Sequence, residues 1–295
     1  PRANKIIAEY PNQSTLPSPG ERKQGVRCLS GSTMRGAAPT PLPLPLLLIS
    51  VLASVALSQT FLELLPPVHD AGRVRDGDDL YCESWKFTVE TNDAGIWRTI
   101  PSRCLEFVKD YMGGPRYDSD CDAVAGDCVD YALTVGVLRG AGDGKDAWIF
   151  DVDETLLSNL PYYVANDFGS FNETSFDEWV DLAVAPAIPS SLKLYGELQR
   201  LGFKLVLLTG RDEDERNATE KNLLFAGYQN WEMLILRGQS DIGKSAALYK
   251  SERRAWLASQ GYRICGNSGD QWSDLIGSPM AKRSFKLPNP MYYIG

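Results

Sequence analysis

Short apolar runs alternate, between residues 147 and 265, with longer stretches in which apolar residues recur every three or four positions. The runs predict strands at residues 147–150, 204–208, 233–236 and 262–265. The stretches between them predict helices near residues 190–201, 213–225 and 250–259. Strands that read as continuous apolar runs between helices are typical of a parallel sheet covered on both faces. The pattern therefore predicts an α/β fold with a Rossmann-like parallel sheet.

The regions on either side of this alternation read differently. Residues 78 to about 140 contain apolar spacings of three and four, clearest at residues 102–111 and 120–138. They predict an N-terminal helical segment. Near the other end of the chain, residues 283–287 predict one more strand.

The first 58 residues resemble processed segments rather than a folded core. We interpret residues 1–33, a polar stretch ahead of Met34, as a translated leader or a disordered tail. Residues 34–58 contain an apolar run and end in Ala-Leu-Ser, which predicts a secretory signal peptide with a small-x-small cleavage site. The run is too short to span a membrane comfortably. We expect a secreted or vacuolar protein.

Residues 59–77 then form a linker, which leaves residues 78–295 as the folded domain. Residues 1–58 contain six Lys/Arg and two Asp/Glu, so the other 237 residues carry 24 basic and 36 acidic side chains, a net charge of −12 against −8 for the whole chain. Such a surface repels nucleic acids and anionic membranes, so neither is an expected partner. A homodimer is compatible with the sequence.

Export would expose the cysteines of the mature chain to an oxidising compartment. There are five: Cys82, Cys104, Cys121, Cys128 and Cys265. Because five is odd, at least one stays free or pairs between chains, and Cys121 and Cys128 are too far apart to pair if both lie on one helix. Secretion would also make Asn172 and Asn217, each in an Asn-x-Thr sequence, candidate glycosylation sites.

Polar side chains follow the ends of three predicted strands. Asp151 and Asp153 follow the first strand, Thr209-Gly-Arg211 follows the second, and Asp270 and Asp274 follow the fourth. Ligands of an open α/β sheet bind in the crevice at these ends. If the chain stays extended, Asp151 and Asp153 point to the same side.

Two aspartates in one crevice suit phosphoryl transfer. An ionised Asp151 can attack phosphorus, while Asp153 can hold a proton for the leaving alkoxide and later deprotonate water. Asp270 and Asp274 would join Asp151 as oxygen ligands of Mg²⁺, together with a main-chain carbonyl and waters. Thr209 and the N–H groups of its loop would bind the phosphoryl group. We interpret Arg211 as a structural ion-pair partner and leave it out of the catalytic set.

Residues 238–245 match Gly-x-x-x-x-Gly-Lys-Ser, the pattern of a nucleotide-binding phosphate loop. Only 50 residues follow, too few for the further strands and second acidic metal site that such a protein needs, and Asp241 within the loop would repel a phosphate. We reject the nucleotide site. The catalytic lysine is then either Lys244 or Lys250.

Taken in order, these motifs resemble a known family. Asp-x-Asp-Glu-Thr, Leu-Leu-Thr-Gly-Arg, a lysine and Gly-Asp-x-x-x-Asp resemble the haloacid dehalogenase-like (HAD-like) superfamily. More narrowly, the chain resembles the plant acid phosphatase and vegetative storage protein family (class B acid phosphatases) over nearly all of residues 78–295. The segments that carry this resemblance include Tyr81-Cys-Glu-Ser-Trp85, Ser158-Asn-Leu-Pro-Tyr-Tyr163, Arg216-Asn-Ala-Thr-Glu-Lys-Asn222 and Phe285-Lys-Leu-Pro-Asn-Pro-Met-Tyr-Tyr293.

The resemblance implies a role for each site residue. Asp151 is the nucleophile, Asp153 the general acid/base, and Thr209 and Gly210 bind phosphate. A Lys-Ser pair about twenty residues ahead of the metal loop favours Lys250 over Lys244 as the catalytic and phosphate-binding lysine. The implied Mg²⁺ ligands are Asp151, Asp153, Asp270 and Asp274.

The resemblance also implies a small cap over the crevice at residues 158–189. Its aromatic residues either form walls for the substrate's leaving group or simply pack the cap; they are Tyr162, Tyr163, Phe168, Phe171 and Trp179. A single histidine, His69, and the lack of Cys-x₅-Arg exclude histidine- and cysteine-based phosphatases.

We therefore expect a Mg²⁺-dependent acid phosphatase that hydrolyses small phosphomonoesters through an aspartyl-phosphate. An acidic optimum is expected because Asp153 must start protonated. Some storage members of the family carry serine at the nucleophile position, which implies weak or lost catalysis. The alternative is therefore a vegetative storage protein, but Asp151 keeps the catalytic set complete.

Overall fold

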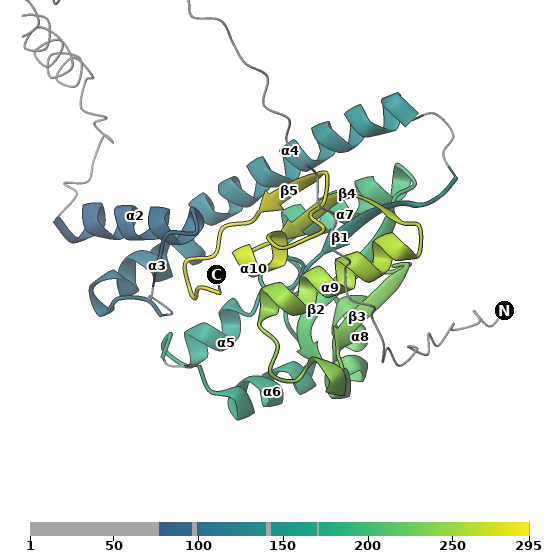
Figure 1. Cartoon of the computed structure of the whole chain (residues 1–295). Coiled ribbons are helices and arrows are strands. Elements are labelled where there is room, and N and C mark those ends of the chain that lie inside the picture. The colour runs from purple at the N-terminus through teal and green to yellow at the C-terminus, as the bar shows by residue number, and fades with distance from the viewer. Residues whose placement is uncertain (1–76, 96–98, 140–142, 170, 295) are drawn as a thin grey trace, which may run out of the picture. The chain divides into compact units, whose positions relative to one another are not determined.

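The computed structural model describes residues 77–95, 99–139, 143–169 and 171–294 (Figure 1). A sheet of five parallel strands lies at its centre, in the order β3-β2-β1-β4-β5. The strands are β1 (Asp146–Phe150), β2 (Lys204–Asp212), β3 (Met233–Arg237), β4 (Arg263–Gly269) and β5 (Arg283–Lys286). The predicted final strand is confirmed, and it joins the sheet beside β4. The predicted signal peptide at residues 34–58 and most of the linker lie outside the described residues.

Helices cover both faces of this sheet. They are α2 (Gly77–Glu90), α3 (Leu105–Met112), α4 (Pro115–Arg139), α5 (Leu160–Ala165), α6 (Glu173–Leu182), α7 (Pro189–Arg200), α8 (Arg216–Phe225), α9 (Ala246–Ser259) and α10 (Trp272–Leu275). Three short 3-10 turns, η1 (Ser102–Cys104), η2 (Glu213–Glu215) and η3 (Gln239–Asp241), precede α3, α8 and α9. No helix within the described ranges has both the length and the apolar character to cross a lipid bilayer.

Alternate residues of each strand supply the two hydrophobic cores. Trp148 and Phe150 of β1 pack in one core with residues of α4 and α7. Ala147 and Ile149 pack on the opposite face, in a core that includes Leu257 of α9. This alternation explains why the strands read as continuous apolar runs, because both of their faces are buried.

Strands β2 and β4 each continue four residues beyond their predicted ends. The continuation of β4 is polar in sequence but buried, and its polar side chains are satisfied: Asn267 donates to the main-chain oxygen of Asp274, 2.9 Å away, and Ser268 accepts from the indole of Trp148 at 3.0 Å. Gly266 is required there, since a Cβ atom would lie 2.4 Å from the Trp148 ring. The extra length places Thr209-Gly-Arg211 within β2 rather than after it.

A disulfide between Cys82 and Cys104 joins α2 to η1. The other described cysteines, Cys121, Cys128 and Cys265, are buried outside this disulfide. As predicted, Cys121 and Cys128 lie on one helix, α4, and do not pair.

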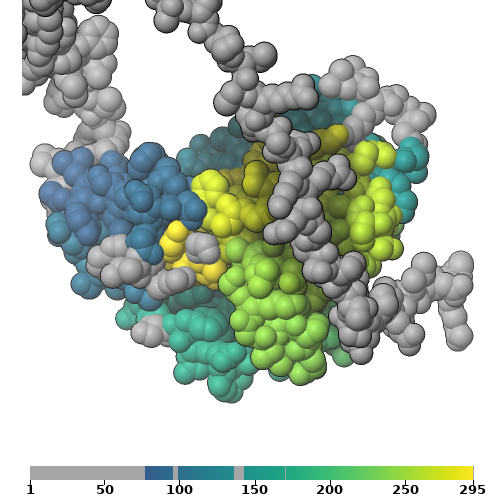
Figure 2. Space-filling model, in the orientation of Figure 1, coloured from purple at the N-terminus to yellow at the C-terminus, as the bar shows by residue number. Residues whose placement is uncertain are grey.

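The C-terminal residues return to the N-terminal helices. In Figure 2 their yellow surface adjoins the blue surface of those helices and the teal surface of residues 158–189. Met291 packs in a third core with residues of α2, α3 and α5. Trp272 of α10 donates to the main-chain oxygen of Glu90 at the end of α2. The tail is thereby held beside the crevice at the carboxyl ends of the strands.

Candidate active site

Strand β1 ends directly in the candidate active site. The main-chain N–H of Asp151 donates to the carbonyl of Ser268 at 3.0 Å, which continues the pairing of β1 with β4. A cavity of about 500 Å³ opens at this edge of the sheet. Its lining includes six of the predicted site residues, which are Asp151, Asp153, Gly210, Lys250, Asp270 and Asp274.

Three of these residues form a buried acidic cluster. Each of Asp151, Asp270 and Asp274 offers a carboxylate oxygen, and the three atoms all lie within 4.8 Å of one another. Lys250 of α9 places its Nζ atom 2.5 Å from Asp151 and 2.6 Å from Asp274. Three carboxylates and one ammonium leave a formal charge of −2. Buried oxygen ligands with this excess charge fit a divalent cation.

The charge of the cluster also appears in its protonation behaviour. Burial raises the pKa of Asp151 well above its ordinary value, and repulsion from Asp274 and Asp270 adds to the effect although Lys250 opposes it. Burial, with repulsion from Asp274 and Glu154, raises the pKa of Asp270 to about 7. A bound cation would offset both causes by favouring the ionised forms.

Hydrogen bonds from three different parts of the chain orient the Asp270 carboxylate. Thr155, Gln271 and Asn289 donate to its oxygens at 3.1, 2.7 and 2.8 Å. The main-chain N–H of Asn289 in turn donates to Glu90 of α2 at 3.0 Å. The C-terminal tail and the N-terminal segment therefore both help to position one acidic residue of the cluster. Sequence reasoning missed these supporting residues, because nothing in their local pattern marks them.

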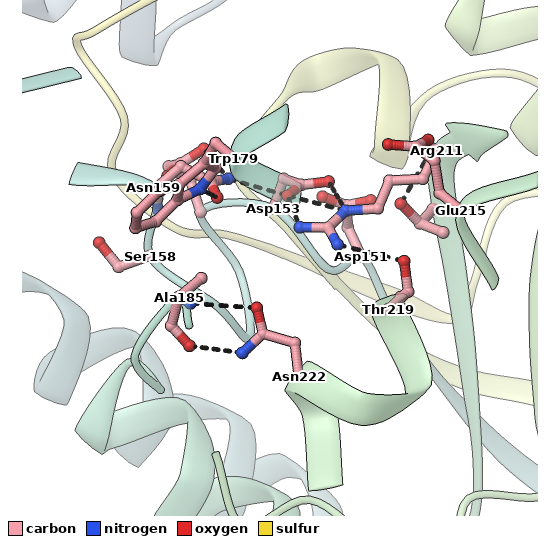
Figure 3. Close-up of polar contacts among 12 residues, drawn as sticks. Asp151, Asp153, Ser158, Asn159, Trp179, Ala185, Arg211, Glu215, Thr219 and Asn222 are labelled. Carbon is pink, nitrogen blue, oxygen red and sulfur yellow. Dashed lines mark hydrogen bonds and ion pairs between the residues drawn. The ribbon is translucent and has the colours of Figure 1, made fainter. Parts of the chain in front are cut away.

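Asp153 lies apart from the cluster, in an ion pair. Figure 3 shows its carboxylate facing the guanidinium of Arg211, whose Nη2 atom is 2.7 Å from Oδ1. Arg211 is buried and also donates from Nη1 to Thr219 at 3.1 Å. The structure thus brings together the carboxylates of three of the four predicted metal ligands and leaves that of Asp153 with Arg211.

This ion pair bears on the expected acidic optimum. Burial alone would raise the pKa of the Asp153 carboxyl, but the charge and hydrogen bonds of Arg211 outweigh burial and hold that pKa below its ordinary value. The side chain is therefore ionised near neutral pH in the metal-free, substrate-free protein. Arg211, expected to be a structural ion-pair partner, pairs with the predicted general acid itself.

The remaining predicted residues lie as follows. Gly210 lines the cavity. Thr209 is fully buried beneath it and accepts a hydrogen bond from the N–H of Arg211 at 3.1 Å. Lys244 pairs instead with Asp241 and Glu252, outside the acidic cluster. Of the two candidate lysines, the structure therefore places Lys250 in the site.

Residues 238–245, which match the phosphate-loop pattern, fold around the carboxylate of Asp241. Asp241 is fully buried and accepts hydrogen bonds from the main-chain N–H of Gly238 and from Lys244, each at 3.0 Å. Arg253 of α9 contacts the same carboxylate. The main-chain N–H of Gly238, which a phosphate would need in this loop, therefore already donates to the Asp241 carboxylate.

Residues 158–189, the predicted cap, contain α5 and α6 and supply aromatic side chains to the cavity wall. Tyr163, Phe168 and Phe171 line the cavity. Tyr162 instead packs edge-on against Phe176, with ring centres 5.2 Å apart. Trp179 donates from its indole Nε1 to Oδ1 of Asn159 at 2.8 Å. The aromatic residues of this segment therefore divide between wall and packing.

Glu154 is a second buried carboxyl beside the site. It accepts hydrogen bonds from Tyr292 at 2.5 Å and from the N–H of Asn159 at 2.6 Å. Burial, with repulsion from Asp153, raises its pKa to about 7.

The raised pKa values of Glu154 and Asp270 predict a pH-dependent stability of the metal-free protein. Because folding raises the pKa of each carboxyl, each stabilises the folded protein at a pH below its ordinary pKa, which is 4.5 for Glu154 and 3.8 for Asp270. This stabilisation is lost as the pH rises through about 7. In EDTA, we expect the Tm to fall by roughly 5 °C or more between pH 5 and pH 8. Thermal denaturation followed by circular dichroism measures it. The Glu154→Gln variant should show a smaller fall, and an equal or steeper fall in that variant would refute the assignment.

Known proteins resemble this chain in fold and in sequence. The solved structure of the class C acid phosphatase from Bacillus anthracis superposes with a TM-score of 0.52 and 23% identity, covering 64% of this chain and 85% of that one. The likeness shows a shared fold. A sequence model of the family described as "HAD superfamily, subfamily IIIB (Acid phosphatase)" matches residues 71–295.

The chain belongs to this acid phosphatase family. "Acid phosphatase 1" of Solanum lycopersicum is 55% identical over 219 residues, 74% of this chain and 85% of that protein. "Vegetative storage protein 2" of Arabidopsis thaliana is 36% identical over 217 residues, 72% and 80% of the two chains. These findings confirm the predicted family and the α/β fold, and with them the enzyme class that defines the family, acid phosphatase.

Proposed function

We propose that this protein is a Mg²⁺-dependent acid phosphatase that hydrolyses small phosphomonoesters through a phosphoryl group on Asp151. The observation that carries the proposal is the buried cluster of Asp151, Asp270 and Asp274 with Lys250, which opens onto the cavity. The similarity to the tomato acid phosphatase supports the same activity. The predicted signal peptide at residues 34–58 and the Cys82–Cys104 disulfide support a secreted or vacuolar location.

The carboxylates of Asp151, Asp270 and Asp274 would hold the cation, and the main-chain carbonyl of Asp153 is a further candidate ligand. When bound, Mg²⁺ would supply positive charge that reduces the repulsion between the Asp151 carboxylate and an anionic phosphate. The hard oxygen donors of the cluster favour Mg²⁺ over softer metals.

In the first step, an oxygen of Asp151 forms a bond to phosphorus while the bond from phosphorus to the ester oxygen breaks. Asp153 gives its proton to that departing oxygen, so an alcohol leaves. In the second step, Asp153 accepts a proton from water as the water oxygen attacks phosphorus. The bond between phosphorus and the Asp151 oxygen breaks, which restores the Asp151 carboxylate and releases inorganic phosphate.

The other site residues stabilise the charge on the phosphoryl oxygens. Lys250 lies 2.5 Å from Asp151 and can pair with a phosphoryl oxygen beside it. At about 4 Å, such a charge pair is worth roughly 4 kcal/mol at an effective dielectric near 20, before desolvation is subtracted. The N–H of Gly210, which lines the cavity, and the hydroxyl of Thr209 are the proposed phosphoryl donors.

The similarity to vegetative storage proteins supports a second candidate function, a storage protein with weak or no turnover. Asp151 and its complete set of charged partners favour the enzyme.

One assay separates the two functions and tests the metal. The purified protein is expected to hydrolyse p-nitrophenyl phosphate at acidic pH. EDTA should lower the rate about 100-fold because the cation contributes several kcal/mol of charge stabilisation, and added Mg²⁺ should restore it. The diester bis(p-nitrophenyl) phosphate is the matched control and should not be hydrolysed. A slow rate that EDTA leaves unchanged would instead favour the storage protein.

A further inference from the structure

We propose that helix α6 positions the general acid of the reaction, through a hydrogen-bond relay from Trp179 to Asn159 to Asp153. Trp179 and Asn159 are assigned here as positioning residues, not as residues that touch substrate. The inference rests on the proposed function, because it presumes that Asp153 delivers a proton to the leaving group.

The relay consists of two hydrogen bonds of ordinary length. The indole Nε1–H of Trp179, in the second half of α6, donates to Oδ1 of Asn159 at 2.8 Å. The Nδ2 atom of Asn159 donates to Oδ1 of Asp153, also at 2.8 Å. Figure 3 shows Asp153 between Arg211 on one side and Asn159, with Trp179, on the other.

The chemistry of Asn159 fixes the direction of the relay. An indole nitrogen can only donate, so the amide oxygen of Asn159 must face Trp179. The amide nitrogen then faces the acids, and it also donates to Glu154 at 3.3 Å. Asn159 is fully buried, so water does not replace these partners readily.

The donors around Asp153 single out one of its two oxygens for the proton. Oδ1 accepts from Nδ2 of Asn159 at 2.8 Å and from Nη2 of Arg211 at 2.7 Å, so both of its lone pairs are engaged. Among the described residues, Oδ2 accepts only from Nε of Arg211, at 3.1 Å, and that N–H group is shared with Oδ1 at 3.2 Å. Because Asp153 lines the cavity, Oδ2 is the oxygen assigned to carry the proton. A rotated carboxylate would present the proton in the wrong direction.

The same helix also forms part of the cavity wall. Phe176 and Asp177 of α6 line the cavity, whereas Trp179 on the same helix reaches Asn159. The position of α6 is therefore linked to both the space for the leaving group and the orientation of the acid. A purely packing role for Trp179 would require its ring alone and not its N–H group.

The test compares substrates whose leaving groups differ in their need for a proton. p-Nitrophenolate leaves readily without protonation, whereas an alkyl alkoxide such as that of β-glycerol phosphate requires it. Trp179→Phe keeps an aromatic ring but removes the donor. It should lower kcat/KM for β-glycerol phosphate, which reports only the steps up to release of the alcohol, about fivefold. It should leave kcat/KM for p-nitrophenyl phosphate within about twofold. The second step, which uses Asp153 with both substrates, affects kcat but not kcat/KM.

Two further variants sharpen the test. Asn159→Ala should lower kcat/KM for the alkyl ester about 30-fold, with the same selectivity between substrates in kcat/KM. The double variant should be no worse than Asn159→Ala, because Trp179 acts through Asn159. Tyr162→Phe is the matched control: it removes a long hydrogen bond from the same aromatic cluster, 3.4 Å to the carbonyl of Asn172, and should leave both rates unchanged.

Equal losses of kcat/KM on both substrates, no loss on either, or additive effects on kcat/KM in the double variant would each overturn the relay. If Trp179→Phe does not fold, the substrate ratio of Asn159→Ala decides alone. A wild-type protein that hydrolyses neither ester would instead overturn the proposed function and the relay with it. The two failures are thus distinguishable.

Discussion

Replacing Asp151 by asparagine is expected to lower kcat for p-nitrophenyl phosphate on the order of 10⁵-fold. The amide is nearly isosteric with the carboxylate but is a far weaker nucleophile, so no covalent phosphoryl group forms. The same change removes one carboxylate from the cluster. A neutral amide then replaces the carboxylate whose Oδ1 atom lies 2.5 Å from Nζ of Lys250. Steady-state kinetics with saturating Mg²⁺ measure the effect.

The fold of this variant should survive, because the substitution keeps the size of the side chain and relieves repulsion with Asp270 and Asp274. Far-ultraviolet circular dichroism checks this. Asp181→Asn, which changes an exposed carboxylate on α6 in the same way, is the matched control and should retain full activity. A rate for Asp151→Asn within about tenfold of the wild type would rule out Asp151 as the nucleophile.

The second large effect is expected for Asp153→Asn, whose turnover should fall on the order of 10³-fold. The two chemical steps should be slowed to different extents. With p-nitrophenyl phosphate the leaving group departs without a proton, so the first step continues. The second step stalls, because no base deprotonates the attacking water. The variant should therefore release about one equivalent of p-nitrophenol per active site in a rapid burst and then turn over slowly.

The pairing with Arg211 supplies the control for this variant. Asp153→Asn leaves the buried guanidinium without its carboxylate, so some loss of stability is expected. Thermal denaturation separates this loss from the kinetic effect. A variant that shows slow turnover without any burst would place Asp153 in the first step rather than the second.

Much of the fold was predictable because its signals are local. Each strand is buried on both faces, so its apolar run is visible in the sequence, as for β1. The polar end of β4 was not predictable from hydropathy, because Asn267 and Ser268 are buried only by virtue of partners elsewhere in the chain. The order of the strands depends on long-range pairing that no local pattern encodes.

The site divides in the same way. The motif residues follow strand ends, so topology alone brings Asp151, Asp270 and Asp274 together. Their support comes from far away, as when Glu90 holds Asn289, 199 residues later in the chain. Such partners have no sequence signature. Asp153 was expected among the metal ligands from the family resemblance, and the structure pairs its carboxylate with the guanidinium of Arg211.

Phosphorus is expected to become bonded to Asp151 during turnover. The direct measurement is mass spectrometry of Asp153→Asn, mixed with p-nitrophenyl phosphate and Mg²⁺ and quenched in acid at the end of the burst. The expected result is a mass gain of one phosphoryl group. Borohydride reduction, which converts a phosphorylated aspartate to homoserine, should mark residue 151. An unmodified protein, or a phosphoryl group on any other residue, would contradict it.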